Sequence, residues 1–175
     1  WSWSRGLGDV YKRQATLWAE KNGGTVWIST YTRTLQHQIA AELTRLYPDA
    51  SERSAKIVLR KGRENYLCLL NLEEALVQMP GQPHRATALG LMARWVGASS
   101  DGDLTGASFP AWLLDLLGRP QTAGLADRRG ECIHAACSHY NRCFVEKSIR
   151  AAKRADIVVT NHARVLIQAA YASPT

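Results

Sequence analysis

The sequence predicts an α/β fold in which strands bracket a long, mostly helical insertion. Residues 25–30 (TVWIST) and 156–160 (DIVVT) are β-branched runs of strand length. Between them, apolar residues recur at helical spacing in several stretches that turn residues separate. The length of 175 residues allows one domain or parts of two. The composition, 46% hydrophobic and 21% charged, is typical of a globular protein that buries a core.

The stretch after the first strand predicts the beginning of a βαβ unit. A short polar loop leads into a helical repeat of apolar side chains that stops at Pro48. Thr32 or Thr34 is expected to cap this helix, because a threonine hydroxyl can accept from the free amides of a first turn. A second short strand is predicted over 54–59 and precedes a basic segment.

The insertion is predicted to be helical, with two loops and one cysteine-bearing turn region. Helices are expected over 66–79, 84–97 and 109–117, and the last of these is expected to bury Trp112, Leu113 and Leu116. Loops are expected over 98–108 and 119–130, and tight turns over 132–143. A basic amphipathic helix over 144–155 then leads into the strand at 156–160, and a final helix is expected over 162–171.

Both ends of the chain differ from the rest. Residues 1–14 (WSWSRGLGDVYKRQ) show neither helical nor strand periodicity and resemble translated sequencing-adapter sequence. We treat them as a non-native segment outside fold reasoning, with a true N-terminal arm as the alternative. The last residues, YASPT, follow directly on an apolar helical pattern. The sequence therefore predicts an internal fragment of a longer protein.

The composition excludes some classes of protein. The net charge of +7 favours a polyanionic partner. The longest uncharged apolar runs fall far short of the ~20 residues that cross a bilayer, which excludes a spanning helix. Four cysteines without a signal peptide indicate a reducing compartment, where a cysteine set more often binds metal than cross-links. We therefore expect a cytoplasmic protein without a membrane partner.

The cysteines form one candidate metal site: Cys68, Cys132, Cys137 and Cys143. Three of them lie within twelve residues, and the fourth is 64 positions upstream of that group. Zinc sites usually use close cysteine pairs, so this wider spacing favours an iron–sulfur cluster with one remote ligand. A structural zinc, disulfides and free buried thiols remain as alternatives, and His134 or His139 can replace one ligand.

Two groups of basic residues are candidates for nucleic-acid contact. The first is a stripe at i, i+3, i+7 spacing along the helix predicted over 144–155: Lys147, Arg150 and Arg154. Such a stripe can follow a phosphate backbone, and a solvated helix face is the alternative. The second group is Lys61 and Arg63, beside Tyr66, which either stacks on a base or packs in the core.

Three segments, taken together, resemble one family. TVWISTYTRTLQHQI is similar to a helicase motif Ia, and KGRENYLC is similar to a signature whose cysteine is the first cluster ligand. CIHAACSHYNRCF, followed by a basic helix and ADIVVTNHARVL, resembles the last three cluster ligands and the strand that precedes a DEAH box. These segments resemble the XPD/DinG (Rad3-like) DNA helicases of superfamily two, in the bacterial DinG-like branch. The resemblance covers about residues 15–170.

The resemblance implies a partial RecA-like P-loop NTPase motor domain with an inserted 4Fe-4S cluster subdomain. Residues 15–60 and 156–175 then belong to the motor domain, which is truncated before the DEAH box, and residues 61–155 form the insertion. The implied activity is ATP-dependent 5′→3′ unwinding by a monomer acting on single-stranded DNA or a forked duplex. ATP and Mg²⁺ are cofactors of the full-length parent only.

The family also implies roles for individual residues. The cysteines carry over one for one as cluster ligands. The motif Ia segment, which lines the DNA track in such motors, contributes Thr30, Thr32, Arg33 and Gln36. Lys61, Arg63 and the basic helix join them as DNA-contacting candidates, the helix at the duplex junction.

The sequence departs from the family pattern in two places. It contains no G-x-x-x-x-G-K-[ST] loop, so no backbone cradle or lysine for ATP phosphates is present. It also contains no DEAH box. We therefore assign no catalytic or ATP-binding residue and expect the fragment alone to lack ATPase activity. The alternative functions are a non-enzymatic, zinc-stabilised nucleic-acid-binding module and a structural α/β domain with free thiols.

Overall fold

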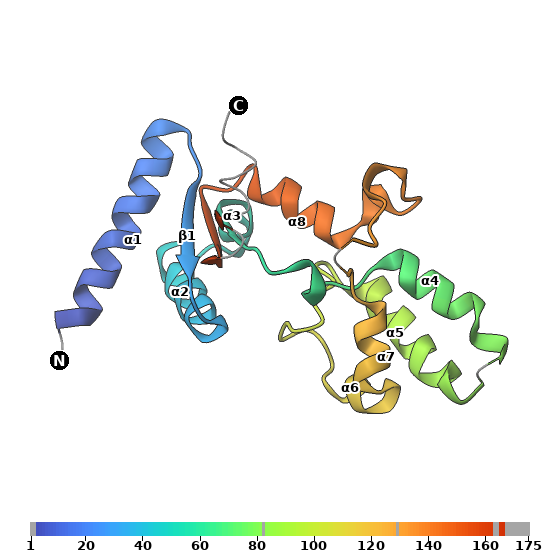
Figure 1. Ribbon diagram of the computed structural model, residues 1–175. Coiled ribbons are helices and arrows are strands. Elements are labelled where there is room, and N and C mark those ends of the chain that lie inside the picture. Colours follow the sequence, from blue (N-terminus) through green and yellow to red (C-terminus); the bar gives the residue numbers. More distant parts are fainter. Residues whose placement is uncertain (1–2, 82, 129, 163–164, 167–175) are drawn as a thin grey trace. The chain divides into compact units, whose positions relative to one another are not determined.

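The computed structural model describes residues 3–81, 83–128, 130–162 and 165–166. It divides into two compact units (Figure 1), of which the first comprises the chain up to Lys61 and from Ser148 onward, and the second runs from Gly62 to Lys147. The first unit holds a parallel sheet with helices and the second is helical, which confirms the α/β class. The assignment of these units to a motor domain and a cluster subdomain stays a prediction.

The sheet of the first unit has three parallel strands in the order β1-β3-β2. They are β1 (Val26–Thr30), β2 (Ile57–Leu59) and β3 (Ile157–Asn161). The central strand β3 pairs with both neighbours, and Ile157, Val158 and Val159 are fully buried. A continuous apolar run is typical of a parallel strand that is covered on both faces. The strands predicted at 25–30 and 156–160 are confirmed.

Helices cover both faces of this sheet. Leu43 of α2 (Arg33–Leu46) packs against Ile157 and Val159. The intervening Val158 packs against Ala152, at the end of α8 (Phe144–Ala152), and against Ala155. Successive strand residues point to opposite faces, so these contacts place α2 and the end of α8 on different sides. Thr32 caps α2, because its hydroxyl accepts from the Leu35 amide at 3.2 Å.

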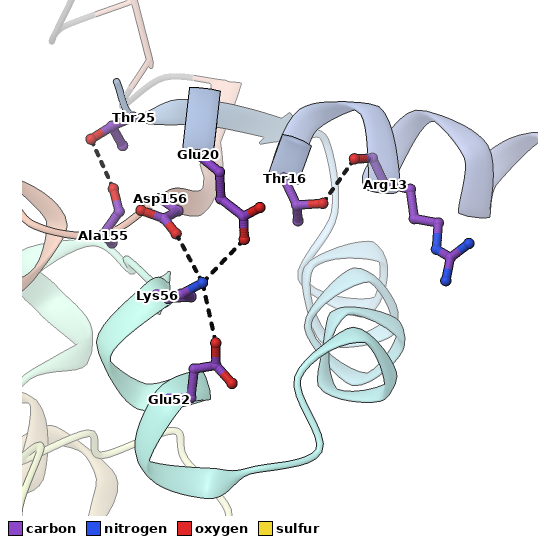
Figure 2. Close-up of polar contacts among 8 residues, drawn as sticks. All are labelled: Arg13, Thr16, Glu20, Thr25, Glu52, Lys56, Ala155 and Asp156. Carbon is purple, nitrogen blue, oxygen red and sulfur yellow. Dashed lines mark hydrogen bonds and ion pairs between the residues drawn. The ribbon is translucent and has the colours of Figure 1, made fainter. Parts of the chain in front are cut away.

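Lys56 joins several elements at the amino-terminal edge of the sheet (Figure 2). Its ammonium lies 3.1 Å from Glu20, 3.2 Å from Glu52 and 3.9 Å from Asp156. It also lies 5.0 Å from the centre of the Tyr47 ring. These partners, above all the hydrogen bond to Glu20, raise the pKa of Lys56. The cluster connects α1 (Trp3–Asn22), α3 (Ala50–Lys56) and the chain entering β3.

One prediction in this unit was wrong, and one segment without a predicted structure is helical. Residues 3–14 form the first part of α1, whose packing positions Thr16 and Ala19 lie in its second half, and whether this segment is native stays a prediction. A helix nucleated there extends at little cost per residue, so its outer turns need no apolar pattern. Residues 54–56 belong to α3 and not to a strand, because the Asp49 carboxylate caps that helix by accepting from the Ser51 amide at 2.8 Å.

Over the described residues, the second unit contains four whole helices and several short turns. The helices are α4 (Leu69–Val77), α5 (Ala86–Ala98), α6 (Trp112–Leu117) and α7 (Arg119–Leu125). Helix α8 begins in this unit, since the boundary falls between Lys147 and Ser148. The most deeply buried large side chains are Leu67, Leu89, Met92 and Leu113. Among the described residues, none of the helices combines the length and apolar character that crossing a bilayer demands.

The loop predicted over 119–130 is partly wrong, because its first part forms α7. Gly118, with a φ of 89°, ends α6 and precedes the new helix directly. Pro120 sits in the first turn of α7, where its missing N–H costs no hydrogen bond. The helix predicted from residue 66 begins only at Leu69, because the preceding residues pair in a strand-like way instead.

The buried face of α6 also differs from the prediction. Trp112 and Leu116 are 55% and 51% exposed, whereas Leu113 and Leu117 are buried. The segment WLLDLL offers two apolar pairs at i, i+4 spacing, and periodicity alone does not choose between them. The helix predicted over 162–171 and the truncation at 156–175 fall mostly outside the described residues. Asn161 ends β3, and His162, Val165 and Leu166 are helical.

Candidate metal centre and nucleic-acid interface

The four cysteine thiols line one small cavity in the second unit. All four are half-buried and none forms a disulfide. Cys68 is the residue before α4, Cys137 and Cys143 each follow a single 3-10 turn, and Cys132 precedes the first of these turns. The structure therefore brings together the residues that the sequence predicted as one ligand set.

Backbone pairing brings Cys68 to the other three cysteines. Leu67 forms a bridge with Ala126, and the Cys68 amide donates to the Leu125 carbonyl at 2.8 Å. The Asp127 amide donates to the Tyr66 carbonyl at 3.1 Å. These backbone bonds join the chain on either side of the 64-position gap. The signature segment thus acts as a short antiparallel brace for the site.

The other three cysteines are positioned by two tight turns. The Cys137 amide donates to the His134 carbonyl at 3.0 Å, and the Cys143 amide to the Tyr140 carbonyl at 3.3 Å. Each turn thereby presents one cysteine at its end. His134 has a left-handed backbone (φ 50°), and its N–H donates to the Cys132 sulfur at 3.4 Å.

Arg63 connects the thiol site to a buried carboxylate. Its guanidinium donates to the Cys132 sulfur at 3.5 Å, and its Nε lies 3.2 Å from the Asp127 carboxylate. The Asp127 side chain is only 5% exposed. The described contacts direct the Arg63 side chain toward Cys132 and Asp127, and its predicted contact with DNA stays a prediction.

Burial controls the protonation of two of the thiols. It raises the pKa of Cys68 and of Cys143 above the ordinary value of 9.0. Backbone amides at the start of α4 and of α8 lower these pKa values in part, by donating to the sulfurs. Both thiols are therefore neutral near pH 7 without metal. Metal binding would displace their protons and supply the missing positive charge.

The donor chemistry of this site fits an iron–sulfur cluster. Four thiols surround one cavity, and N–H groups of Arg63 and His134 point at a ligand sulfur, as at cluster thiolates. A single zinc ion needs four donors at about 2.3 Å from one point, and zinc remains the alternative. Within the described part of the chain, no three His, Cys, Asp or Glu side chains are arranged to hold a metal ion of either kind. His139 lines the cavity, and its Nε2 contacts Glu73 at 2.9 Å.

The motif Ia residues lie where β1 passes into α2, in the first unit. Thr30 is 1% exposed and donates its hydroxyl to the Thr160 carbonyl at 3.1 Å, and Gln36 is 5% exposed. Thr32 is exposed, but its hydroxyl caps α2. Arg33 begins α2, and its side chain lies outside the described residues. Thr30 and Gln36 therefore support the loop from inside, while Tyr31 and Thr32 face solvent.

The predicted basic stripe lies on α8 and just beyond it. The Lys147 ammonium donates to the Ser100 carbonyl at 2.8 Å, within the second unit. Arg150 is half-buried, and Arg154, past the end of the helix, donates to the Arg150 carbonyl at 3.4 Å. Lys61 is half-buried and follows β2 directly. The DNA-binding role of these residues stays a prediction.

Sequence reasoning missed two exposed rings at the carboxyl edge of the sheet. Tyr31 is 84% exposed, and its ring centre lies 6.0 Å from that of His162, which is also exposed. The Ser29 hydroxyl contacts Nδ1 of the same histidine. Ligand sites of open parallel sheets lie beyond the carboxyl ends of the strands. That rule, applied to the residues that follow each predicted strand, points to both rings.

Comparisons with known proteins give a consistent result. No protein-family model matches the chain. Proteins named ATP-dependent DNA helicase YoaA are 31% identical over 77% of this chain in Haemophilus influenzae and 30% identical over 90% of it in Escherichia coli. ATP-dependent helicase DinG of Mycobacterium tuberculosis is 30% identical over 91% of the chain.

The chain matches only part of each relative. The matched region is 20% of the Haemophilus protein, 24% of the Escherichia protein and 26% of the Mycobacterium protein. These similarities confirm the resemblance that the motifs predicted. The chain is therefore homologous to one segment of the DinG-like helicases.

Proposed function

We propose that this chain is the part of an ATP-dependent DNA helicase that carries a 4Fe-4S cluster and a portion of the single-stranded DNA track. The observation that carries the proposal is the shared cavity of Cys68, Cys132, Cys137 and Cys143. The names of the relatives support the helicase activity of the parent. In this role the parent acts in the bacterial cytosol as a monomer, with 5′→3′ polarity.

The four cysteines would hold the cluster, and the cluster would supply a rigid covalent brace for the second unit. Cys68 anchors that brace to α4, and Cys143 anchors it to α8. Arg63 would hold the Cys132 sulfur from outside by its N–H donor, while Asp127 fixes the guanidinium. A residue that orients a ligand in this way raises the affinity of the site for its metal.

The DNA contacts would come from both units. In the first unit, the loop after β1 would contribute the exposed Thr32, and Lys61 follows β2 at the same edge of the sheet. Lys147, Arg150 and Arg154 would bind phosphates of the single strand or the forked duplex. ATP and Mg²⁺ would act in the parent, whereas this sequence supplies no Walker lysine.

The cofactor is tested by anaerobic purification of the chain, followed by iron, acid-labile sulfide and zinc determination. We expect equal iron and sulfide with the visible absorbance of a cluster, and loss of both in Cys137→Ser. Stoichiometric zinc in a colourless protein would contradict the cluster and favour the zinc-stabilised nucleic-acid-binding module. A protein that binds neither iron nor zinc would favour the remaining alternative, a structural α/β domain with free thiols.

DNA binding is tested by fluorescence anisotropy with a labelled single strand over a series of salt concentrations. We expect affinity to fall with salt, and each of Lys147→Ala and Arg150→Ala to weaken binding. Arg94→Ala, an exposed position of α5 outside the stripe, is the matched control. Unchanged affinity in both stripe variants would show that α8 does not contact the DNA. ATP turnover by the 175-residue chain would contradict the expected inactivity.

A further inference from the structure

The carboxyl edge of the sheet carries a surface that the predicted DNA contacts do not include. Tyr31 occupies the short connection between the last residue of β1, Thr30, and the first residue of α2. Its side chain is 84% exposed, although tyrosine usually buries most of its ring. Single exposed aromatic residues are common on protein surfaces, so exposure alone does not identify a site.

The backbone on both sides of Tyr31 is fixed. The Thr30 hydroxyl donates to the Thr160 carbonyl at 3.1 Å inside the sheet. The Thr32 carbonyl accepts from the Gln36 amide at 3.1 Å, and its hydroxyl accepts from the Leu35 amide at 3.2 Å. A ring held on a rigid connection loses little freedom when a ligand binds to it. The fixed backbone therefore holds the Tyr31 ring in an exposed position.

A second ring lies beside it from the neighbouring strand. Thr30 pairs with Asn161, so the residue after each, Tyr31 and His162, emerges at the same edge. The ring centres are 6.0 Å apart and the planes are inclined at 58°, so the rings do not cover each other's faces. The Ser29 hydroxyl contacts Nδ1 of His162 and thereby orients the imidazole.

The third strand adds cationic residues to this edge. Arg60 follows β2, donates its amide to the Val159 carbonyl at 2.9 Å and accepts from the Thr160 hydroxyl at 2.9 Å. Lys61 comes next in the chain. The ends of β1 and β3 thus present a phenol ring and an imidazole, and Lys61 follows the end of β2, while the Arg60 guanidinium lies 5.8 Å from the centre of the Trp27 ring. Aromatic side chains beside a cationic groove are the features that bind unpaired bases and their phosphates.

We infer that Tyr31 and His162 form a stacking surface for a base of single-stranded DNA. The inference rests on the proposed function and assigns the base contact to the edge rings, whereas the basic residues contact phosphates. Stacking is insensitive to base identity, because every base has a π-face. This surface would thus hold the strand without restricting its sequence.

The test compares two probes: a labelled oligothymidylate and an abasic strand of the same length. The unvaried chain is expected to bind the oligothymidylate more tightly. Tyr31→Ala should weaken that binding by about five-fold or more, and His162→Ala should weaken it in the same direction. Neither variant should change the affinity for the abasic strand or the salt dependence, because the phosphate contacts remain. Tyr31→Phe should bind as the unvaried chain does.

Tyr11→Ala is the matched control, since Tyr11 is another exposed tyrosine of the first unit, on α1. Its affinity for both probes should be unchanged. Binding of the oligothymidylate by Tyr31→Ala as tightly as by the unvaried chain would overturn the inference and leave the proposed DNA binding intact. An unvaried chain that binds neither probe would overturn both. Thermal unfolding of each variant serves as the control for its folding.

Discussion

Replacing Arg63 with Met should destabilise the brace around the cysteines. The change removes the guanidinium and with it the contacts to the Asp127 carboxylate and the Cys132 sulfur. The methionine retains most of the apolar stem, so the packing is largely kept. What remains is a carboxylate that is 5% exposed and has lost its cationic neighbour.

The magnitude follows from the geometry of the ion pair. At 3.2 Å and an effective dielectric constant of about 20, the attraction is about 5 kcal/mol before desolvation. Breaking a fully buried pair on one side costs about 3–5 kcal/mol. Arg63 is 21% exposed, so water screens part of this interaction. We therefore expect a loss of about 3 kcal/mol for Arg63→Met, and a smaller loss for the double variant with Asp127→Asn.

Hydrogen exchange of the reduced, metal-free chain measures this loss locally. The informative amides are those of Cys68, bonded to Leu125, and Asp127, bonded to Tyr66. Arg94→Met on α5 is the matched control. If the opening free energies of both amides in Arg63→Met stay within about 0.5 kcal/mol of the unvaried chain, the reasoning about the buried pair is refuted.

Three further changes have defined outcomes. Lys56→Met should lower the stability of the first unit by about 1–2 kcal/mol in urea unfolding, because it removes the contacts to Glu20 and Glu52. The loss should be smaller at high salt, which screens these contacts. Lys21→Met, at an exposed position, is the control and should have little effect. Hydrogen bonds from Ser51 lower the pKa of Asp49, so its capping contribution is present above the ordinary value of 3.8 and is lost as pH falls through the lower folded value. Asp49→Ala should therefore reduce the melting temperature near neutral pH and flatten its decline in acid; an unchanged acid limb would contradict this. In the metal-loaded chain, Cys137→Ser should increase hydrogen exchange in residues 132–143 while α4 and α5 keep their protection; equal loss throughout the second unit would contradict this.

The sheet and the grouping of the four cysteines were predictable because each depends on a strong local pattern. The β-branched runs around Ile28 and Val158 have no helical alternative of similar quality, and parallel strands buried on both faces are continuously apolar. Cysteine spacing restricts the chemistry of the site before any fold is known. The pairing of the segments around Leu67 and Ala126 could not be predicted from either pattern. This pairing uses backbone hydrogen bonds, which any residue type can form.

The wrong predictions share a different cause. Short helices such as α6 and α7 have few residues in contact with the core, so propensity and periodicity decide little there. Leu113 is buried and Leu116 is exposed although both are leucines of one turn. The choice between them is made by the helices against which α6 packs, and that information is not local.

The thiol site combines one half that backbone bonds and a buried ion pair hold in place with one half that is built on single turns. Cys68 is held by backbone bonds to 125–127 and by the Arg63–Asp127 pair, neither of which involves a ligand. Cys137 and Cys143 depend on two isolated 3-10 turns in a polar segment whose side chains are mostly exposed. Single turns of this kind contribute little stability of their own. The free energy of metal binding would therefore be spent on ordering residues 132–143 against a preformed anchor, to which Arg63 of the signature contributes.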